Sequence, residues 1–168
     1  MAQTTEKATR REASSCLVFG EQGLDQTEDT GSVSQTKALI LESLTVKADR
    51  IVCELLLAPG FPHASSPQLA KLLCARFPQL AFHTCRNTVG NIFSAVADHT
   101  SIPHLLEHLV IELQVQNSQE PETTYVGTSE WIDKKAGRAR IEVSFTDDLS
   151  ALRAFRDASD ILNKALLE

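Results

Sequence analysis

Residues 102–117 read IPHLLEHLVIELQVQN, and strands and helices are predicted both before and after this stretch. Its apolar side chains recur at helical spacing, and Ser101 directly before it can cap the first turn. Pro103 is tolerated in that turn because the backbone N–H that proline lacks would have no partner there. The stretch therefore predicts one amphipathic helix over residues 102–117.

The sequence before this helix predicts two adjacent strands and two further helices. Residues 38–46 (ALILESLTV) and 50–58 (RIVCELLLA) are apolar, partly β-branched runs that a short polar break separates. Residues 65–67 (SSP) offer an N-cap followed by proline, so we expect a helix that begins there and stops before Pro78. Apolar residues at helical spacing predict another helix from about residue 88 to residue 98.

The sequence after the central helix predicts a second pair of strands and a final helix. Residues 124–132 (TYVGTSEWI) and 139–145 (ARIEVSF) alternate as strands do, and residues 133–137 form the turn between them. Asp147 and Asp148 then open a helix in which leucine, isoleucine and phenylalanine side chains are expected to face the sheet: Leu149, Leu152, Phe155, Ile161 and Leu162. The order ββαααββα predicts a single α+β domain, a mostly antiparallel sheet with helices packed on one side.

Composition divides the chain into a tail and one domain. Residues 1–36 are rich in polar residues and have an apolar cluster only at Cys16 to Phe19, so we expect a disordered tail. Residues 37–168 are long enough for one domain with a real core. The net charge of −6 argues against a general nucleic-acid surface, because phosphate binding needs clustered basic side chains.

The same composition argues against a membrane protein. No apolar run approaches the roughly 20 residues that span a bilayer, and the first residues lack the apolar stretch of a secretory signal. We therefore expect a cytoplasmic protein. The four cysteines show no CxxC pairing, so each is expected to be a buried apolar thiol or a ligand.

His104, Glu107 and His108 are the main candidates for a functional site. On a helix, side chains four residues apart project from the same face, so the two imidazoles can close on a single ion. The order His-x-x-Glu-His is that of the inverzincins, in which the carboxylate takes the proton from water that zinc has activated. The same residues can also form the polar face of an ordinary amphipathic helix, and spacing alone leaves both interpretations open.

A third ligand must come from elsewhere, and the sequence offers Cys85, Glu112 and Glu142. Cys85 is a good candidate because a thiolate binds zinc strongly and because the segment before the central helix can return it to the site. Glu112 lies one turn beyond His108 and can equally orient that histidine from behind. Glu142 lies on a predicted strand, where its other interpretation is a charge that faces outwards.

From residue 104 to residue 114 the chain reads HLLEHLVIELQ and resembles the N-terminal domain of cyanophycin synthetases, in which a very similar helix ends in Glu-Leu-Gln. The resemblance covers about residues 48–168 and extends backwards from this helix through Phe77-Pro78-Gln79-Leu80, His83-x-Cys85, Gly90 and Thr100. It implies an α/β domain that can carry a zinc-dependent hydrolase site cutting the polymer of aspartate and arginine, beside a scaffolding role. By matching position, His104, Glu107, His108 and Cys85 carry over, and Cys85 is favoured as the third ligand.

Three departures from the family bear on substrate recognition and synthesis. The family's Gly-Thr-Trp-Met-Gly stretch is here residues 100–103, and its Gly-Phe-Gly-Arg-Thr-Arg loop is replaced by residues 126–129. The acidic residue of its following strand falls near Ser144, which leaves Glu142 close by. The 168 residues do not include the ATP-grasp and Mur-ligase-like domains, so we expect no synthetase activity from them.

Two functional hypotheses follow. In the first, the chain is a zinc-dependent hydrolase of a peptide-like or polyamide substrate, with one zinc ion held by His104, His108 and Cys85 and with Glu107 as the base. In the second, it is a non-catalytic interaction or assembly module with the same fold. The sequence names neither a particular substrate nor an oligomeric state. A closed, four-ligand metal site would favour the second hypothesis, whereas an open coordination position would favour the first.

Overall fold

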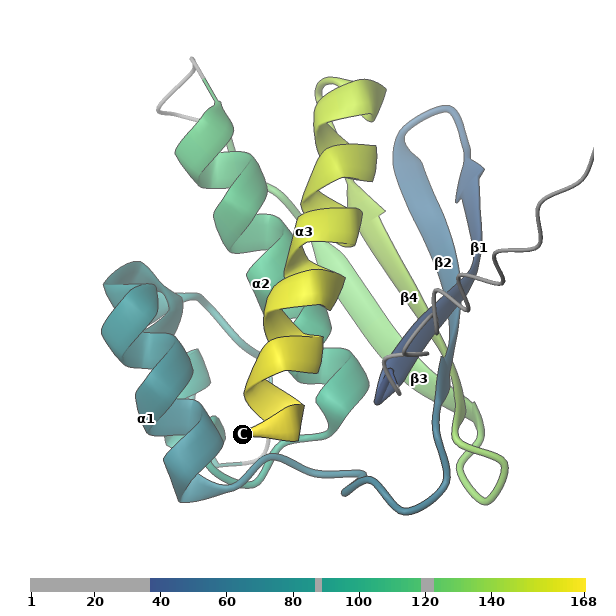
Figure 1. The fold of residues 1–168 in the computed structure, drawn as a ribbon. Coiled ribbons are helices and arrows are strands. Elements are labelled where there is room, and N and C mark those ends of the chain that lie inside the picture. Colours follow the sequence, from purple (N-terminus) through teal and green to yellow (C-terminus); the bar gives the residue numbers. More distant parts are fainter. Residues whose placement is uncertain (1–36, 87–88, 119–122) are drawn as a thin grey trace, which may run out of the picture. The chain divides into compact units, whose positions relative to one another are not determined.

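Two β-hairpins share one sheet in the computed structural model of the protein (Figure 1). β1 (Leu39–Val46) pairs with β2 (Arg50–Leu57), and β3 (Gly127–Asp133) pairs with β4 (Arg138–Ser144). β2 and β4 join the hairpins, so the strand order is β1-β2-β4-β3, and every pair is antiparallel. The predicted α+β class with an antiparallel sheet is confirmed.

The structure describes residues 37–86, 89–118 and 123–168. The tail predicted over residues 1–36 lies outside the described residues, as does Thr88 at the expected start of one helix. None of the helices in the described parts of the chain is long and apolar enough to cross a membrane.

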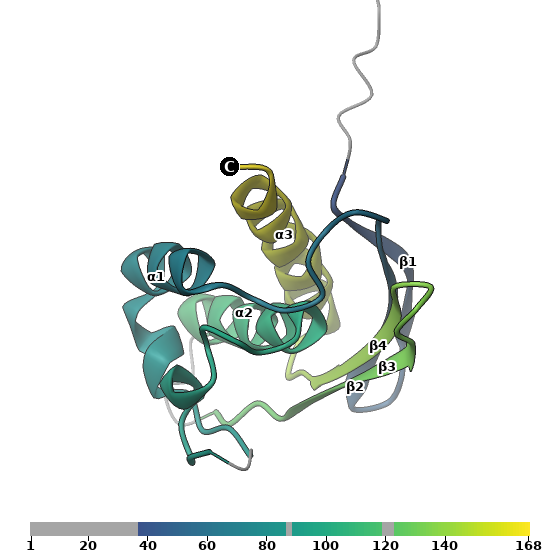
Figure 2. The same cartoon turned by 90° about the horizontal axis from the view of Figure 1, so that it is seen from below.

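Three α-helices begin at the predicted caps. Ser66 caps α1 (Pro67–Arg76), because its side chain accepts the N–H of the third residue of that turn. Ser101 caps α2 (Ile102–Asn117) in the same way, and Asp147 caps α3 (Asp148–Leu167). Figure 2 shows α2 and α3 on the same side of the sheet, as the sequence predicts.

The helix predicted over residues 88–98 is not formed in the described part of that segment, which contains only a short 3-10 helix, Phe93–Ala95. The backbone bonds with an earlier segment instead: the Cys85 N–H donates to the Asn91 carbonyl at 3.0 Å, and the Phe93 N–H donates to the His83 carbonyl at 2.8 Å. Residues 83–85 and 91–93 are therefore tied together by backbone bonds, and the segment that contains them is called the 83–93 loop below. Gly90 adds to this outcome because glycine lowers helix propensity.

The core lies between the inner face of the sheet and helices α2 and α3. Alternate residues of β2 and β4 are buried there, and α2 contributes Leu105, Leu106 and Leu109, all of them fully buried. On α3 the buried stripe is Ala151, Ala154, Phe155, Ala158 and Leu162. Leu149, expected to face the sheet, is 59% exposed because it lies on the far side of the helix from this stripe.

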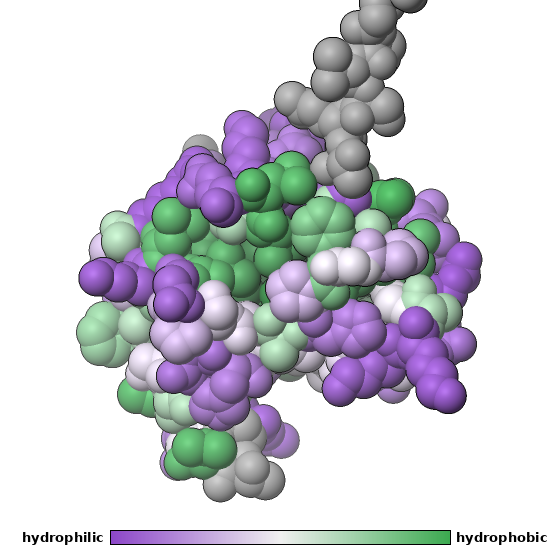
Figure 3. Space-filling model, turned by 60° about the horizontal axis from the view of Figure 1, so that its bottom comes forward, coloured by the Kyte–Doolittle hydropathy of each residue, from purple (hydrophilic) through white to green (hydrophobic). Residues whose placement is uncertain are grey.

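Part of the apolar surface remains open on the helical side. In Figure 3, apolar side chains gather in one area of the molecule and hydrophilic side chains surround it. Exposed leucines include Leu72 on α1 and both Leu149 and Leu167 on α3. The candidate functional residues lie on α2, on the 83–93 loop and at the start of β3.

Candidate metal centre

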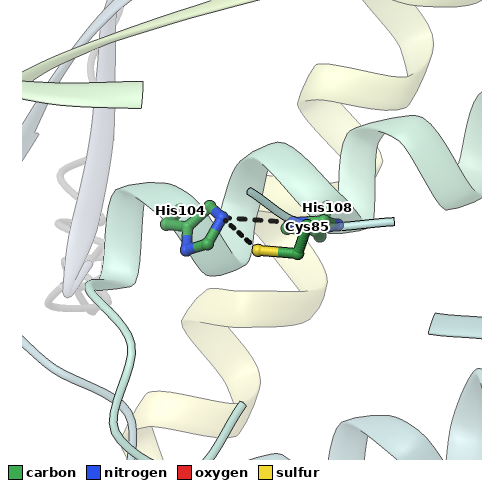
Figure 4. Close-up of side chains that lie close together, drawn as sticks. All are labelled: Cys85, His104 and His108. Carbon is green, nitrogen blue, oxygen red and sulfur yellow. Dashed lines mark hydrogen bonds between the residues drawn. The ribbon is translucent and has the colours of Figure 1, made fainter. Parts of the chain in front are cut away.

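Cys85, His104 and His108 come together beside α2 (Figure 4). The Nε2 atoms of His104 and His108 lie 3.1 Å apart, and the Sγ atom of Cys85 lies 3.4 Å from the Nε2 atom of His104. All three potential ligand atoms fall within 4.8 Å of one another. The helix supplies the two imidazoles at i, i+4, and the 83–93 loop supplies the thiol.

The ring of Phe93 packs against both imidazoles. It is fully buried and lies with its centroid 4.2 Å from that of His108 and 5.7 Å from that of His104, the latter in an edge-to-face arrangement. The Phe93 N–H also donates to the carbonyl of His83, so a backbone bond joins the residue that supports the histidines to the segment that carries Cys85. Aromatic pairs of this geometry stabilise a defined ring orientation.

The second nitrogen of His104 is already engaged. Its Nδ1 atom lies 2.6 Å from the Thr100 hydroxyl oxygen, just before the N-cap of α2. A neutral imidazole has one donor and one acceptor nitrogen, so when the Thr100 hydroxyl accepts the Nδ1–H, the Nε2 lone pair faces Cys85 and His108. Thr100 thereby orients the His104 ring toward the cluster.

His108 is oriented by a longer chain of hydrogen bonds. Its Nδ1 atom lies 3.3 Å from Nδ1 of His83, whose Nε2 lies 2.8 Å from a carboxylate oxygen of Glu112. A carboxylate only accepts, so His83 donates from Nε2; a neutral His83 then accepts at Nδ1, and His108 donates from Nδ1. The Nε2 lone pair of His108 is therefore free to face the cluster. Gln116 holds the other Glu112 oxygen at 2.7 Å.

The positions of their side chains distinguish the three candidates for the third ligand. Cys85 joins the two histidines, whereas Glu112 is buried and acts through His83, the second of the two roles considered for it. Glu142 bonds Arg50 at 3.2 Å, and its strand neighbours Ile141 and Val143 face the core, so Glu142 faces away from it. The sequence analysis gave His83 no role. A signal for one was present, because His83 lies two residues before Cys85 and side chains two residues apart in an extended segment point to the same side.

Burial keeps both imidazoles neutral. It lowers the pKa of His108 to about 3, and the neighbouring His104 and His83 act in the same direction because a second positive charge would be repelled. Burial also lowers the pKa of His104. Neutral imidazoles with correctly directed lone pairs are the form that binds metals.

Glu107 is buried beside the cluster rather than in it. It accepts a hydrogen bond from the Ser129 hydroxyl at 2.7 Å. Burial raises the pKa of Glu107 to about 6, and the bond from Ser129 opposes this rise. A Cβ atom on Gly127 would lie 2.6 Å from Cγ of Glu107, so only glycine allows the carboxylate to pack against β3 at this point.

One pocket of about 990 Å³ contains these groups. Cys85, His104, Glu107 and His108 line one part of it, and residues 123–129 line another. A thiolate and two imidazoles are a donor set that suits zinc, and the pocket gives further molecules access to it. The cluster of Cys85, His104 and His108 could hold a metal ion, and the carboxylate of Glu107 lines the same pocket.

A family model described as the cyanophycin synthase-like N-terminal domain matches residues 50–167. A comparison with curated proteins finds no match to this chain.

Proposed function

The chain belongs to the family of cyanophycin synthase-like N-terminal domains, and from this premise we propose that it is a zinc-dependent hydrolase of peptide or amide bonds. The observation that carries the proposal is the meeting of Cys85, His104 and His108 in one pocket with the buried carboxylate of Glu107. A purely structural helix has no need for a thiol and two imidazoles whose potential ligand atoms converge.

The donor atoms fit a zinc ion. Two nitrogen ligands of one tetrahedral zinc ion lie about 3.3 Å apart, and a nitrogen and a sulfur ligand about 3.6 Å apart. The separations from Nε2 of His104, 3.1 Å to His108 and 3.4 Å to Cys85, are close to these values, and all three donor atoms lie within 4.8 Å of one another. A zinc ion held there would supply Lewis acidity, which polarises a substrate carbonyl and lowers the pKa of water.

The protein's own residues supply orientation and proton transfer. Thr100 and the pair His83–Glu112 hold the two imidazoles with their Nε2 atoms toward the cluster. Glu107 takes the proton from the attacking water and delivers it to the leaving amine nitrogen, so one C–N bond breaks as one C–O bond forms. The raised pKa of Glu107 suits this exchange, because a carboxylate with a pKa near 6 accepts and releases a proton close to neutral pH.

The polymer of aspartate and arginine is the first substrate to test, because the resemblance of the central helix to that of cyanophycin synthetases implies a site that cuts it. A mixture of unmodified peptides is the second substrate. Zinc-loaded protein is incubated with each, and newly formed amino groups are measured. We expect hydrolysis that a chelator abolishes and that added zinc restores.

Two substitutions separate the roles of the residues. Glu107→Gln keeps shape and hydrogen bonding but removes the base, so it should retain zinc and lose about 10²-fold or more of the hydrolysis. His108→Ala removes a ligand and should lose both. Metal content and hydrolysis are measured on the same samples.

Two results would contradict the proposal. If Glu107→Gln also loses its metal, Glu107 is a fourth ligand of a closed site, and the non-catalytic assembly module becomes the better account. If Glu107→Gln keeps full activity on a substrate that the wild type cleaves, Glu107 is not the base.

A further inference from the structure

The two edge strands of the sheet, β1 and β3, differ in whether their outward backbone groups have hydrogen-bond partners within the described residues. At the β1 edge, the Leu39 N–H donates to Oδ1 of Asn163 and the Asn163 amide donates back to the Leu39 carbonyl, both at 2.8 Å. A side chain of α3 thus occupies the backbone groups of Leu39 that would otherwise face outwards. β1 also has an irregular register between Leu41 and Ser43. Both features protect an edge from pairing with another chain.

The hydrogen bonds of β3 show which of its backbone groups point outwards. The Ser144 N–H of the segment that ends β4 donates to the Val126 carbonyl at 2.9 Å, so this pair is a hydrogen-bonded one. Hydrogen-bonded and non-hydrogen-bonded pairs alternate along an antiparallel ladder. The N–H and C=O groups of Gly127 and Ser129, one and three positions further along, therefore point away from β4.

The part of this outward edge at Gly127 and Ser129 lacks the usual protection, because the charged residues of β3, Glu130 and Asp133, and its register irregularity between Trp131 and Asp133 lie further along the strand. Among the described residues, β3 pairs only with β4, and it lies at the opposite end of the sheet from β1 (Figures 1 and 2). Residues 123–129 (TTYVGTS) contain neither the charged residue nor the proline that natural edge strands use to repel another strand. Gly127 has no side chain to keep a second backbone at a distance.

The open edge borders the candidate metal centre. Residues 123–129 line the same pocket as Cys85, His104 and His108. Glu107 connects the two sides, because it packs against Gly127 and accepts the hydroxyl hydrogen bond of Ser129. An extended chain paired with β3 at these two residues would lie beside the carboxylate.

We propose that the outward edge of β3 at Gly127 and Ser129 binds an extended peptide backbone by strand addition and so lays it across the pocket of Cys85, His104 and His108. Main-chain hydrogen bonds supply affinity in this mode whatever the peptide sequence, and alternate side chains face the pocket. The substrate class is an extended peptide segment. This inference rests on the proposed function for the fate of the peptide and is tested without hydrolysis.

The test measures amide hydrogen exchange by NMR on the full-length, zinc-loaded Glu107→Gln protein. The probe is an acetylated, amidated hexapeptide of alternating threonine and valine. At about ten times its Kd, exchange at Gly127 and Ser129 should slow about tenfold, because only unbound protein exchanges at these positions. Thr128 and Glu130, whose N–H groups already face β4, should not change.

Two controls isolate the strand pairing. The same hexapeptide with methyl groups on alternate amide nitrogens cannot form the ladder and should give no protection. Ser129→Pro removes the outward N–H but no bond to β4. Ser129→Ala removes only the hydroxyl and is the matched control. The proline variant should bind the hexapeptide about tenfold more weakly than the alanine variant. If Ser129→Pro does not fold, the methylated peptide still decides the question.

Equal protection by both peptides, or none by either, would overturn the inference. So would protection that appears without peptide and grows with protein concentration, because the edge would then pair with a second copy of the chain. Protection by the hexapeptide without hydrolysis by the wild type would leave the inference standing and refute the proposed hydrolase. Hydrolysis by the wild type without protection by the hexapeptide would support the proposed hydrolase and overturn this inference.

Discussion

At the scale of single residues, Gly127 controls the position of Glu107. Gly127→Ala places a Cβ atom 2.6 Å from the Glu107 side chain, so either the carboxylate or β3 must move. We expect an unfolding free energy lower by about 1–3 kcal/mol, as for other overpacked sites. Hydrolysis should fall while zinc content stays constant, because no ligand changes.

Thr128→Ala is the matched control, since Thr128 is exposed and its side chain leaves Glu107 untouched. Denaturant unfolding, metal analysis and hydrolysis are measured on both variants. Equal stability and activity of Gly127→Ala and Thr128→Ala would show that the carboxylate is not held where the structure places it.

His108 gives the metal-free protein a characteristic pH dependence. Its pKa is about 3 in the folded chain and returns to 6.5 on unfolding, so between these values the unfolded chain binds the extra proton. The unfolding free energy should therefore fall as the pH drops from 6.5 towards about 5, by up to about 1.4 kcal/mol per pH unit. His104, whose pKa is also lowered, acts in the same direction.

Glu107 opposes this trend, because its raised pKa makes the folded chain the one that holds an extra proton between pH 4.5 and about 6. The measurement is therefore made in the Glu107→Gln background, by denaturant unfolding with a chelator present. His108→Gln added to that background should make the profile less steep, and the lowered pKa of His104 accounts for the slope that remains. A profile that is already flat without this second substitution would show that His108 is not buried as a neutral group.

The sequence predicts part of the site because part of the site is local. His104, Glu107 and His108 share a helix face by spacing alone, whereas Cys85 remained one of three candidates for the third ligand until the resemblance favoured it. The partners of these residues come from distant segments, Ser129 from β3 and His83 from the 83–93 loop. Their contacts depend on how the elements pack, and no local pattern reports that.

At the scale of secondary-structure elements, Asn163 joins α3 to the edge of the sheet. Asn163→Ala would leave the N–H and C=O of Leu39 buried without their partner. Unpaired buried polar groups are costly, so we expect the unfolding free energy to fall by about 1–3 kcal/mol. Lys164→Ala, at the exposed neighbouring position of α3, is the control.

Denaturant midpoints of the two variants decide this prediction. A midpoint for Asn163→Ala that matches the one for Lys164→Ala would mean that water replaces the amide at no cost, and the β1 edge would not be protected as described. An added tendency of Asn163→Ala to associate would agree with the protective role, because a second edge would then be open.

Elements with a strong local signal were predicted well. The caps Ser66, Ser101 and Asp147 fix three helix starts because a single side chain accepts the orphan N–H groups of the first turn. The helix expected over residues 88–98 was wrong for the part that the structure describes. There, the backbone of residues 91–93 bonds to residues 83–85, and this pairing outweighs an apolar spacing that suits a helix.

At the scale of the whole domain, the metal cluster joins segments that are separate in the sequence. Cys85 lies in the 83–93 loop, and His104 and His108 lie on the helix that packs against both the sheet and α3. Zinc that binds only the folded chain should therefore raise the melting temperature of the whole domain. Cobalt in the same place should show the near-ultraviolet absorption of a thiolate ligand.

The central claim is that Cys85, His104 and His108 form one zinc site, and metal analysis of the full-length, untagged protein tests it most directly. The protein is freed of metal with a chelator, reconstituted with zinc and passed through a desalting column before measurement. Cys85→Ala is treated in the same way, as is the control variant Cys74→Ala, whose thiol lies on α1. We predict about one zinc ion per chain in the wild type and in Cys74→Ala, and a large loss in Cys85→Ala. A zinc content near zero in the reconstituted wild type, or equal contents in all three proteins, would contradict the account.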